Sequence, residues 1–315
     1  MKKFLINIVI FSSIILSIAT MMDFVVSEGL RKTERGHFYT MNAIMTDSIN
    51  ADIVILGNSR ATCSYNPIVL DTILGVNTRN LGVSGQPFGV SYLRWRLYNR
   101  NNIAPKLLII NMDYLELNMV TNGYEKEQYY PYMNDTMVRP YLDLYGFTWL
   151  ERNIPMYRYR GDYKLICLGL FELTHLYHDT KGNYIKGYSN MDNLWKGDNL
   201  EKVLKEGSVK CQNNSQAIDL MESLISKVQL EGVQVVFVYA PIYKKLKDNV
   251  DEKDCIFTYE RISKRYQIPI LDFSNMDICS DTDFFKDANH LNTKGSEIFS
   301  VALANCLDSL SIIKN

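Results

Sequence analysis

Two short polar segments of the chain hold residue types that together can perform nucleophilic catalysis. The first is DANHLNTKG, where Asp287 precedes His290, one of only four histidines, by three residues. At this spacing the carboxylate can bind one imidazole nitrogen and leave the other free to accept a proton. The alternative is an exposed loop histidine beside a helix start that Asn292 would cap. The segment therefore predicts a general base only if a nucleophile lies close to it in the fold.

The second segment is LGNSR, which follows the apolar run IVIL at residues 53–56. A short β-branched run of this kind is typical of a buried parallel strand. Gly57 can relieve a tight turn after the strand, so that Ser59 presents its hydroxyl at the end of the sheet. The alternative is an ordinary polar residue in a strand-to-helix turn. Ser59 is nevertheless the candidate nucleophile that the histidine requires.

A third segment, NLGVSGQPFG, follows a predicted strand at residues 76–81 and holds three glycines. Gly82 comes directly after that strand, where a glycine allows its backbone N–H to approach a substrate oxygen closely. A tight turn would also explain the glycines. The spacing of a phosphate-binding loop is absent from this segment, so it does not indicate nucleotide binding.

The elements that must position these residues alternate between strands and helices. Five strands are predicted, and helices are predicted between them. The strands cover residues 53–56, 76–81, 105–111, 233–241 and 268–273. Alternation of this kind predicts an α/β fold with a doubly wound, five-stranded parallel sheet. Since ligands bind at the carboxyl ends of such strands, the three segments are expected to converge at one edge.

The alternation stops at residues 112–210, which we interpret as a large insertion after the third strand. Residues 111–210 hold 13 of the 21 tyrosines of the chain. These rings could pack on the apolar faces of sugars, or they could fill the core of an irregular subdomain. His175 and His178 lie in the same region without a third ligand nearby, so we predict no metal site.

The N-terminus has the composition of a membrane-spanning helix. Lys2 and Lys3 precede residues 4–22, which carry no charge. Nineteen helical residues span about 28 Å, close to the thickness of a bilayer core. A cleaved signal peptide is the alternative, and both options export the rest of the chain. We expect a single-pass protein of the cell membrane, with an anchor at 1–23, a juxtamembrane segment at 24–50 and an extracytoplasmic domain at 51–315.

The charge and cysteine content of the chain argue against nucleic acid and zinc as ligands. The 315 residues carry a formal net charge of −1, which offers no field for binding nucleic acid. The six cysteines form no C-x-x-C pair, so a zinc site is not supported. In an oxidising compartment some of them could form disulfides, and Cys255 with Cys279 is one candidate pair. Buried free thiols are the alternative.

The three segments together resemble the SGNH/GDSL hydrolase family. ILGNSR matches its serine block, NLGVSGQ its glycine block and DANHLNTKG its Asp-x-x-His block. The resemblance implies a flavodoxin-like sheet and no cofactor. It also implies Ser59 as nucleophile, His290 as general base and Asp287 as the residue that orients it. The N–H groups of Ser59 and Gly82 would form the oxyanion hole.

One block departs from the family pattern. The family's third oxyanion donor is an asparagine after the third strand, and its position in register is occupied here by Leu115. Leu115 has no side-chain donor. Asn111 and Asn118 lie nearby, but neither is in register, so the third donor stays unassigned.

The residue pattern of these blocks, together with one apolar N-terminal helix, is similar to that of membrane-anchored SGNH-like proteins of cell-envelope acylation. These include proteins of alginate O-acetylation and of D-alanyl transfer to teichoic acid. The resemblance implies an anchored serine esterase or O-acyltransferase that acts on acyl groups of an envelope polysaccharide. Its partners would be the acylated glycan, the membrane and a membrane-bound acyltransferase. A non-catalytic glycan-binding or assembly protein with the same fold is the alternative.

Overall fold

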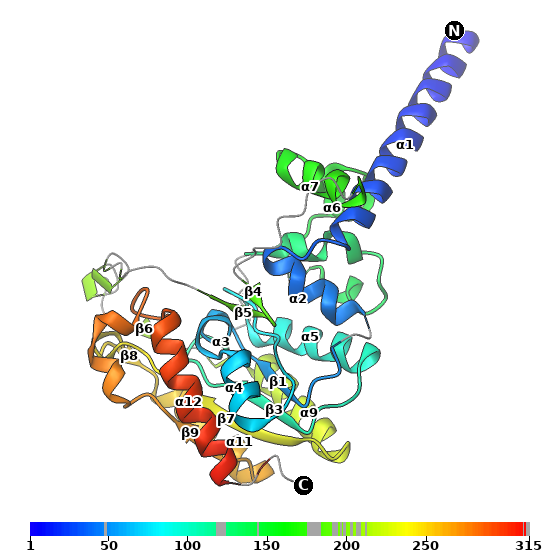
Figure 1. The fold of residues 1–315 in the computed structure, drawn as a ribbon. Coiled ribbons are helices and arrows are strands. Elements are labelled where there is room, and N and C mark those ends of the chain that lie inside the picture. The colour runs from blue at the N-terminus through cyan, green and yellow to red at the C-terminus, as the bar shows by residue number, and fades with distance from the viewer. Residues whose placement is uncertain are drawn as a thin grey trace. The chain divides into compact units, whose positions relative to one another are not determined.

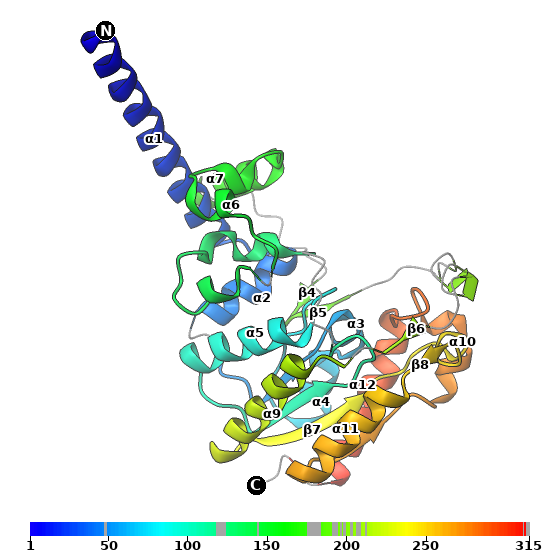
Figure 2. The ribbon, with the colours of Figure 1, turned by 180° about the vertical axis from the view of Figure 1, so that it is seen from behind.

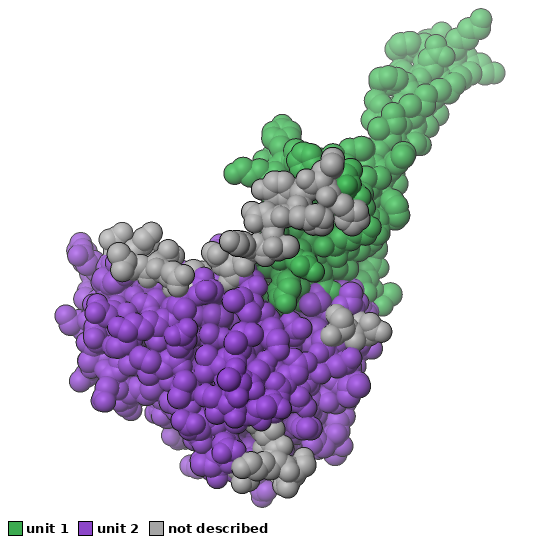
Figure 3. All heavy atoms as spheres, in the orientation of Figure 1, with its two compact units in different colours: residues 1–42, 125–182 green, residues 43–124, 183–315 purple. Residues whose placement is uncertain are grey.

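The structure is a computed structural model of the 315-residue chain. It describes residues 1–46, 49–117, 124–143, 145–174, 184–190, 195, 197, 200–201, 204–205, 209–211, 213–310 and 312. Two compact units divide the chain. Unit 1 comprises residues 1–42 and 125–182, and unit 2 comprises residues 43–124 and 183–315 (Figure 3).

Unit 2 contains a five-stranded parallel sheet of order β2-β1-β3-β7-β9 (Figure 1). The strands are β1 (Ile53–Leu56), β2 (Thr78–Asn80), β3 (Leu107–Asn111), β7 (Gln234–Tyr239) and β9 (Ile270–Asp272). In chain order this is 2-1-3-4-5, the flavodoxin-like order, whose direction switches between β1 and β3. The predicted fold class is confirmed, with strands up to three residues shorter at their ends than the sequence suggested.

The strand sequences explain why this sheet forms. Every residue of β1 and of β3 is buried, which matches their continuous aliphatic runs. Such runs suit strands that helices cover on both faces. The covering helices are α4 (Pro67–Leu74), α5 (Phe88–Asn101), α9 (Ser215–Leu230), α11 (Lys253–Tyr266) and α12 (Thr293–Ser309). Figure 1 shows α12 and α4 on one face, and Figure 2 shows α9 and α11 on the other.

Two predicted helix starts are formed by asparagine side chains. Asn66 accepts a hydrogen bond from the N–H of Ile68 at the start of α4. Asn292 accepts one from the N–H of Gly295 at the start of α12. Each cap pairs a backbone donor that the first turn of a helix would otherwise leave unpaired. The cap at Asn292 also fixes where the chain leaves the loop that carries His290.

The shorter elements of unit 2 complete its surface. They are α3 (Ser59–Ser64), β4 (Tyr184–Ile185), β5 (Tyr188–Ser189), β6 (Val209–Lys210), α10 (Lys244–Lys247), β8 (Val250–Asp251), η4 (Asp277–Ser280) and η5 (Thr282–Phe284). β4 and β5 form an antiparallel hairpin, and β6 pairs with β8 in parallel. The N–H of Asn80 donates to the carbonyl of Lys186, so the hairpin lies against the end of β2.

The disulfide of the chain differs from the candidate pair. Cys255 is bonded to Cys211, while Cys279 is a buried free thiol, so the pairing of Cys255 with Cys279 is wrong. The pairing of β6 with β8 accounts for this, because Cys211 directly follows β6 and its N–H donates to the carbonyl of Asp251, four residues before Cys255.

Unit 1 is built from helices and tyrosine rings. It contains α1 (Lys2–Leu30), most of α2 (Gly36–Met45), η1 (Lys126–Tyr132), η2 (Arg139–Tyr141), α6 (Trp149–Asn153), η3 (Tyr157–Tyr159) and α7 (Tyr163–Thr174). Tyr129 stacks on Tyr145 with ring centroids 4.4 Å apart, and Tyr130 meets Tyr159 edge-on at 5.4 Å. All four are buried, so these rings fill a core. The predicted insertion and the predicted domain boundaries stay predictions.

The first helix, α1, leaves most of its apolar side chains uncovered. Every residue from 1 to 18 is exposed, and the first buried residues are Val26 and Ser27. Among the described residues, α1 is the one helix whose length and composition suit a membrane crossing. It is compatible with a membrane anchor or with a signal sequence.

Candidate active site

Ser59 lies where the direction of the sheet switches, as the first residue of α3 directly beyond β1. The side chain of Asn58 caps α3 by accepting from the N–H of Arg60. Gly57 has φ +152°, and a Cβ there would come within 2.8 Å of the Cβ atoms of Ala61 and Asn111. Only glycine fits this close packing between the end of β1, α3 and β3. The turn therefore brings Ser59 to the carboxyl end of the sheet.

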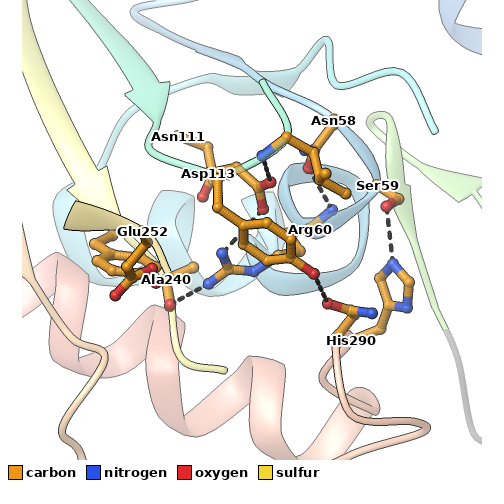
Figure 4. A network of polar contacts seen from close by, with 12 residues as sticks. Asn58, Ser59, Arg60, Asn111, Asp113, Ala240, Glu252 and His290 are labelled. Atoms are coloured by element: carbon orange, nitrogen blue, oxygen red, sulfur yellow. Dashed lines mark hydrogen bonds and ion pairs between the residues drawn. The ribbon is translucent and has the colours of Figure 1, made fainter. Parts of the chain in front are cut away.

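The structure brings together the three residues proposed as a catalytic triad, and Figure 4 shows the contact between Ser59 and His290. His290 Nε2 lies 2.8 Å from Ser59 Oγ, and His290 Nδ1 lies 2.8 Å from Asp287 Oδ1. Asp287 Oδ1 also accepts the backbone N–H groups of Asn289 and His290, at 2.9 and 3.1 Å. The loop thus holds the carboxylate, and the carboxylate holds the imidazole ring against the serine.

The charge state of Asp287 suits this arrangement. Burial by itself would raise its pKa, but the hydrogen bond from His290, the charge of that ring and the N–H of Asn289 outweigh burial and lower the pKa. The carboxylate therefore stays ionised and accepts the proton on Nδ1. With the proton on Nδ1, Nε2 presents its lone pair to the serine hydroxyl.

The backbone N–H of Gly82, which was expected to donate to the oxyanion, already has a hydrogen-bond acceptor. Its N–H donates to the side-chain oxygen of Asn80 at 3.0 Å. A Cβ on Gly82 would lie 3.0 Å from Thr62, so this glycine provides close packing against α3. The prediction that the Gly82 N–H serves the oxyanion is therefore not supported by the structure. The N–H of Ser59, by contrast, has no acceptor among the described residues.

Of the two asparagines considered as a third donor, only Asn111 lies within the described residues. Asn111 is fully buried at the end of β3, and its side-chain oxygen accepts the hydroxyl of Tyr65 at 2.8 Å. It lies in the core, where no substrate oxygen reaches it. Asn118 lies outside the described residues. The side chain of Leu115 is half exposed, and its N–H donates to Asp113 at 2.8 Å.

A donor that the sequence analysis did not single out lies within the Asp-x-x-His segment itself. The hydroxyl of Tyr114 donates to the side-chain oxygen of Asn289 at 2.9 Å. In this orientation the carboxamide oxygen faces Tyr114 and the amide nitrogen points away from it. The amide nitrogen of Asn289 then has no acceptor in the part of the chain that the structure describes, one residue away from His290.

Two carboxylates from the loop after β3 hold the neighbours of Ser59 in place. Arg60 donates to Asp113 at 2.9 Å and to the carbonyl of Ala240, and both charged groups are almost fully buried (Figure 4). Burial would lower the pKa of Arg60, but the charge of Asp113 outweighs it and raises that pKa, so the guanidinium stays charged. The pair thus ties α3 to the ends of β3 and β7.

Glu116 holds the residue on the other side of Ser59. Its carboxyl group accepts the hydroxyl of Ser91 at 3.1 Å, and the nearby backbone N–H of Asn58 favours its charged form. Glu116 is completely buried, and this burial raises its pKa well above the usual range. The segment in which the family carries its asparagine therefore positions the nucleophile here through Asp113 and Glu116.

The arrangement can perform acyl transfer through a serine nucleophile. It has a hydroxyl, a base within hydrogen-bond reach and a carboxylate that orients the base. Within the described residues, no group of three histidine, cysteine, aspartate or glutamate side chains is placed to hold a metal ion.

Comparisons with known proteins find solved structures that resemble this chain at low sequence identity. No family model matches the chain, and no curated protein matches it. A GDSL-like lipase from Bacteroides thetaiotaomicron is 13% identical with a TM-score of 0.39, over 82% of this chain and 88% of that one. A "putative acylhydrolase" from Bacteroides fragilis is 11% identical with a TM-score of 0.40, over 85% and 89%. At such identities and TM-scores, the likeness assigns neither a family nor a function to this chain.

Proposed function

We propose that the chain is an SGNH-type serine esterase or O-acyltransferase. The proposal rests on one observation, the continuous hydrogen-bonded series from Asp287 through His290 to Ser59. The contact of His290 with Asp287 and its contact with Ser59 both measure 2.8 Å. Two of these residues lie 231 positions apart in the chain, so their meeting depends on the whole sheet.

The reaction follows from this geometry in two steps. Ser59 Oγ attacks the carbonyl carbon of an acyl ester while His290 Nε2 takes its proton. The tetrahedral intermediate collapses, the imidazolium gives its proton to the leaving alkoxide, and an acyl-serine remains. A water molecule or a sugar hydroxyl then attacks the acyl carbon while His290 takes its proton. The second tetrahedral intermediate collapses, the bond from the acyl carbon to Ser59 Oγ breaks, and the imidazolium returns the proton to Ser59. Water gives hydrolysis, and a sugar hydroxyl gives transfer.

The oxyanion of the intermediate needs hydrogen-bond donors that have no acceptor before the reaction. We assign this role to the N–H of Ser59 and to the amide nitrogen of Asn289. Support comes from their lack of acceptors among the described residues and from the Tyr114 hydroxyl that holds the carboxamide of Asn289. Gly82 and Leu115 are not assigned a part.

We further propose that the acyl groups belong to a cell-envelope polysaccharide and that α1 anchors the enzyme in the membrane, with unit 2 outside the cytoplasm. Support comes from the uncharged run at residues 4–22, from the resemblance of the motifs to envelope acylation proteins, and from the disulfide between Cys211 and Cys255, which suits an oxidising compartment. A membrane-bound acyltransferase would supply the acyl group in the transfer reaction.

Replacement of the nucleophile tests the proposal directly. Ser59→Ala in the full chain should reduce hydrolysis of p-nitrophenyl acetate to the background, a loss of about 10³-fold or more. Labelling by a fluorophosphonate probe should disappear as well. Ser215→Ala is the matched control, because Ser215 is also the first residue of a helix after a capping asparagine, yet it is exposed and has no histidine partner. Turnover and labelling that survive in Ser59→Ala would refute the serine assignment.

A non-catalytic glycan-binding or assembly protein is the second candidate. The occupied N–H of Gly82 and the leucine at position 115 favour it, because both weaken the oxyanion site that the family pattern implies. This candidate predicts that the wild-type chain resists the fluorophosphonate probe but retains an envelope glycan on an affinity column. Stoichiometric labelling of Ser59 would exclude it.

A further inference from the structure

Helix α7 of unit 1 is apolar but mostly uncovered. Its sequence YKLICLGLFELT has a single buried residue, Gly169. Tyr163, Cys167 and Phe171 are all exposed, and their spacing of four residues places them on one side of the helix. The exposed fractions are 77% for Tyr163 and 48% for Phe171. A helix that faces water normally carries charged residues on this side.

The neighbouring helix α6 is similar. Trp149 is 63% exposed, and Leu150 and Ile154 are also exposed. Both α6 and α7 contact η3, and both ribbon views show them side by side (Figures 1 and 2). We name the exposed apolar side chains of the two helices the α6–α7 face; they are Trp149, Leu150, Ile154, Tyr163, Cys167 and Phe171.

The α6–α7 face is attached to α1 directly after its uncharged run. A Cβ on Gly29 would overlap the backbone of Gly169, so α1 and α7 cross in close contact. Asp23 accepts the N–H of Met156, and Ser27 shares a hydrogen bond with the hydroxyl of Tyr159 at 2.9 Å. These contacts fix α7 and the η3 region to α1 within the stretch from Asp23 to Gly29, and α6 is attached through its contacts with η3.

The position along α1 corresponds to one layer of a bilayer. Seven residues separate Met22, the last residue of the uncharged run, from Gly29, which is about 10 Å of helix. The headgroup region on each side of a bilayer core is about 5–8 Å thick. Tryptophan and tyrosine concentrate in this layer, where their rings are apolar and their polar groups meet water. Trp149 and Tyr163, both exposed on the α6–α7 face, are residues of these two types.

We propose that the α6–α7 face lies in the headgroup boundary of the membrane that α1 crosses, so that its partner is the lipid surface. The inference rests on the anchor in the proposed function. An exposed apolar surface of this kind marks an interaction site, and here it continues the uncovered apolar surface of α1. The face adds a second attachment that holds unit 1 against the bilayer.

Tryptophan fluorescence in the full chain tests the proposal. The chain is reconstituted in phosphatidylcholine vesicles with or without bromine on the acyl carbons nearest the headgroup. The difference between wild type and Trp149→Phe isolates the emission of Trp149. We expect blue-shifted emission that brominated lipid quenches. Phe171→Asp should weaken this quenching, because it places a charge in the same face; since Phe171 is half exposed, the fold should tolerate the change.

Two controls separate this proposal from the anchor. Phe11→Trp in the Trp149→Phe background, measured in vesicles brominated on the acyl carbons near the bilayer centre, reports on α1 itself, because residue 11 lies near the middle of the uncharged run. The Trp149→Phe/Trp195→Phe variant retains Trp95, which is buried in unit 2 and should resist quenching by lipid. If the tryptophan at position 11 is quenched and Trp149 is not, the proposal is overturned while the anchor stands. This holds both when Trp149 is exposed to water, where acrylamide quenches it, and when a second copy of the chain shields it. If neither is quenched, the anchor fails and the proposal fails with it.

Discussion

At the residue scale, both neighbours of Ser59 are held by polar contacts. The side chain of Asn58 accepts the N–H of Arg60, and the guanidinium of Arg60 donates to Asp113, so the serine lies between two residues with fixed positions. The triad could be predicted from sequence because serine, aspartate and histidine are recognisable at their spacings. The two carboxylates, Asp113 and Glu116, could not, because buried acids in a loop after a strand resemble solvated ones until their partners are known.

The amide of Asn289 gives the first prediction at this scale. Asn289→Ala should lower kcat by about 10²–10³-fold, since one oxyanion donor contributes about 2.7–4 kcal/mol in the transition state. Tyr114→Phe should have a smaller effect in the same direction, because the carboxamide stays but loses the hydroxyl that holds it. Esterase kinetics with p-nitrophenyl acetate measure both. An unchanged kcat in Asn289→Ala, with Ser59 still labelled by the probe, would remove Asn289 from the site.

The buried carboxyl of Glu116 gives a pH-dependent prediction. Its pKa is raised in the folded protein, whereas in the unfolded chain a glutamate titrates near 4.3. Above that pH the folded state binds more protons than the unfolded state, so this group makes the free energy of unfolding fall as pH rises toward the folded pKa. Glu116→Gln should therefore have the same free energy of unfolding as wild type near pH 4 and a higher one than wild type at pH 8.

Chemical denaturation at several pH values checks this expectation. Glu201→Gln is the control, because Glu201 is largely exposed and its replacement should leave the pH slope unchanged. A difference between Glu116→Gln and wild type that is constant with pH would show that the carboxyl ionises alike in both states.

At the element scale, the ends of β1, β3 and β7 are joined by polar contacts as well as by the sheet. Arg60, from α3, reaches both Asp113 after β3 and the carbonyl of Ala240 after β7. The strands and the helix caps could be predicted because aliphatic runs, alternation and asparagine caps are local signals, whereas the flavodoxin-like order came only from the family resemblance. The loss of the Gly82 donor could not, because it depends on a side chain, Asn80, that turns back on its own loop.

The buried ion pair makes this linkage testable. Asp113→Ala should destabilise the chain by about 3–5 kcal/mol, because it leaves Arg60 charged and unpaired in the core. The double variant Arg60→Met/Asp113→Ala should recover much of that loss, since it removes the orphaned charge. Urea unfolding of the two variants measures the difference. If the double variant is less stable than the single one, hydrogen bonds of Arg60 other than the ion pair dominate.

At the scale of the whole molecule, each unit is assembled from two separate stretches of the chain. Residues 1–42 join residues 125–182, and residues 43–124 join residues 183–315. The sequence located the irregular region through its missing strands and its tyrosines, but not this grouping. No local pattern reports that α7 packs on α1, since the contact between Gly29 and Gly169 depends on two glycines 140 positions apart.

The interleaved order of the units has a consequence for synthesis. β3 ends at Asn111, and its neighbour β7 begins at Gln234, so 122 residues must be made between them. At about 5–20 residues per second, the growing chain carries the apolar strands β1 and β3, with the edge of β3 unpaired, for roughly 6–25 s. During this interval unit 1 is completed, because its last residue precedes β7. The ribosome thus finishes unit 1 first, while the nascent sheet waits for β7 with the edge of β3 unpaired.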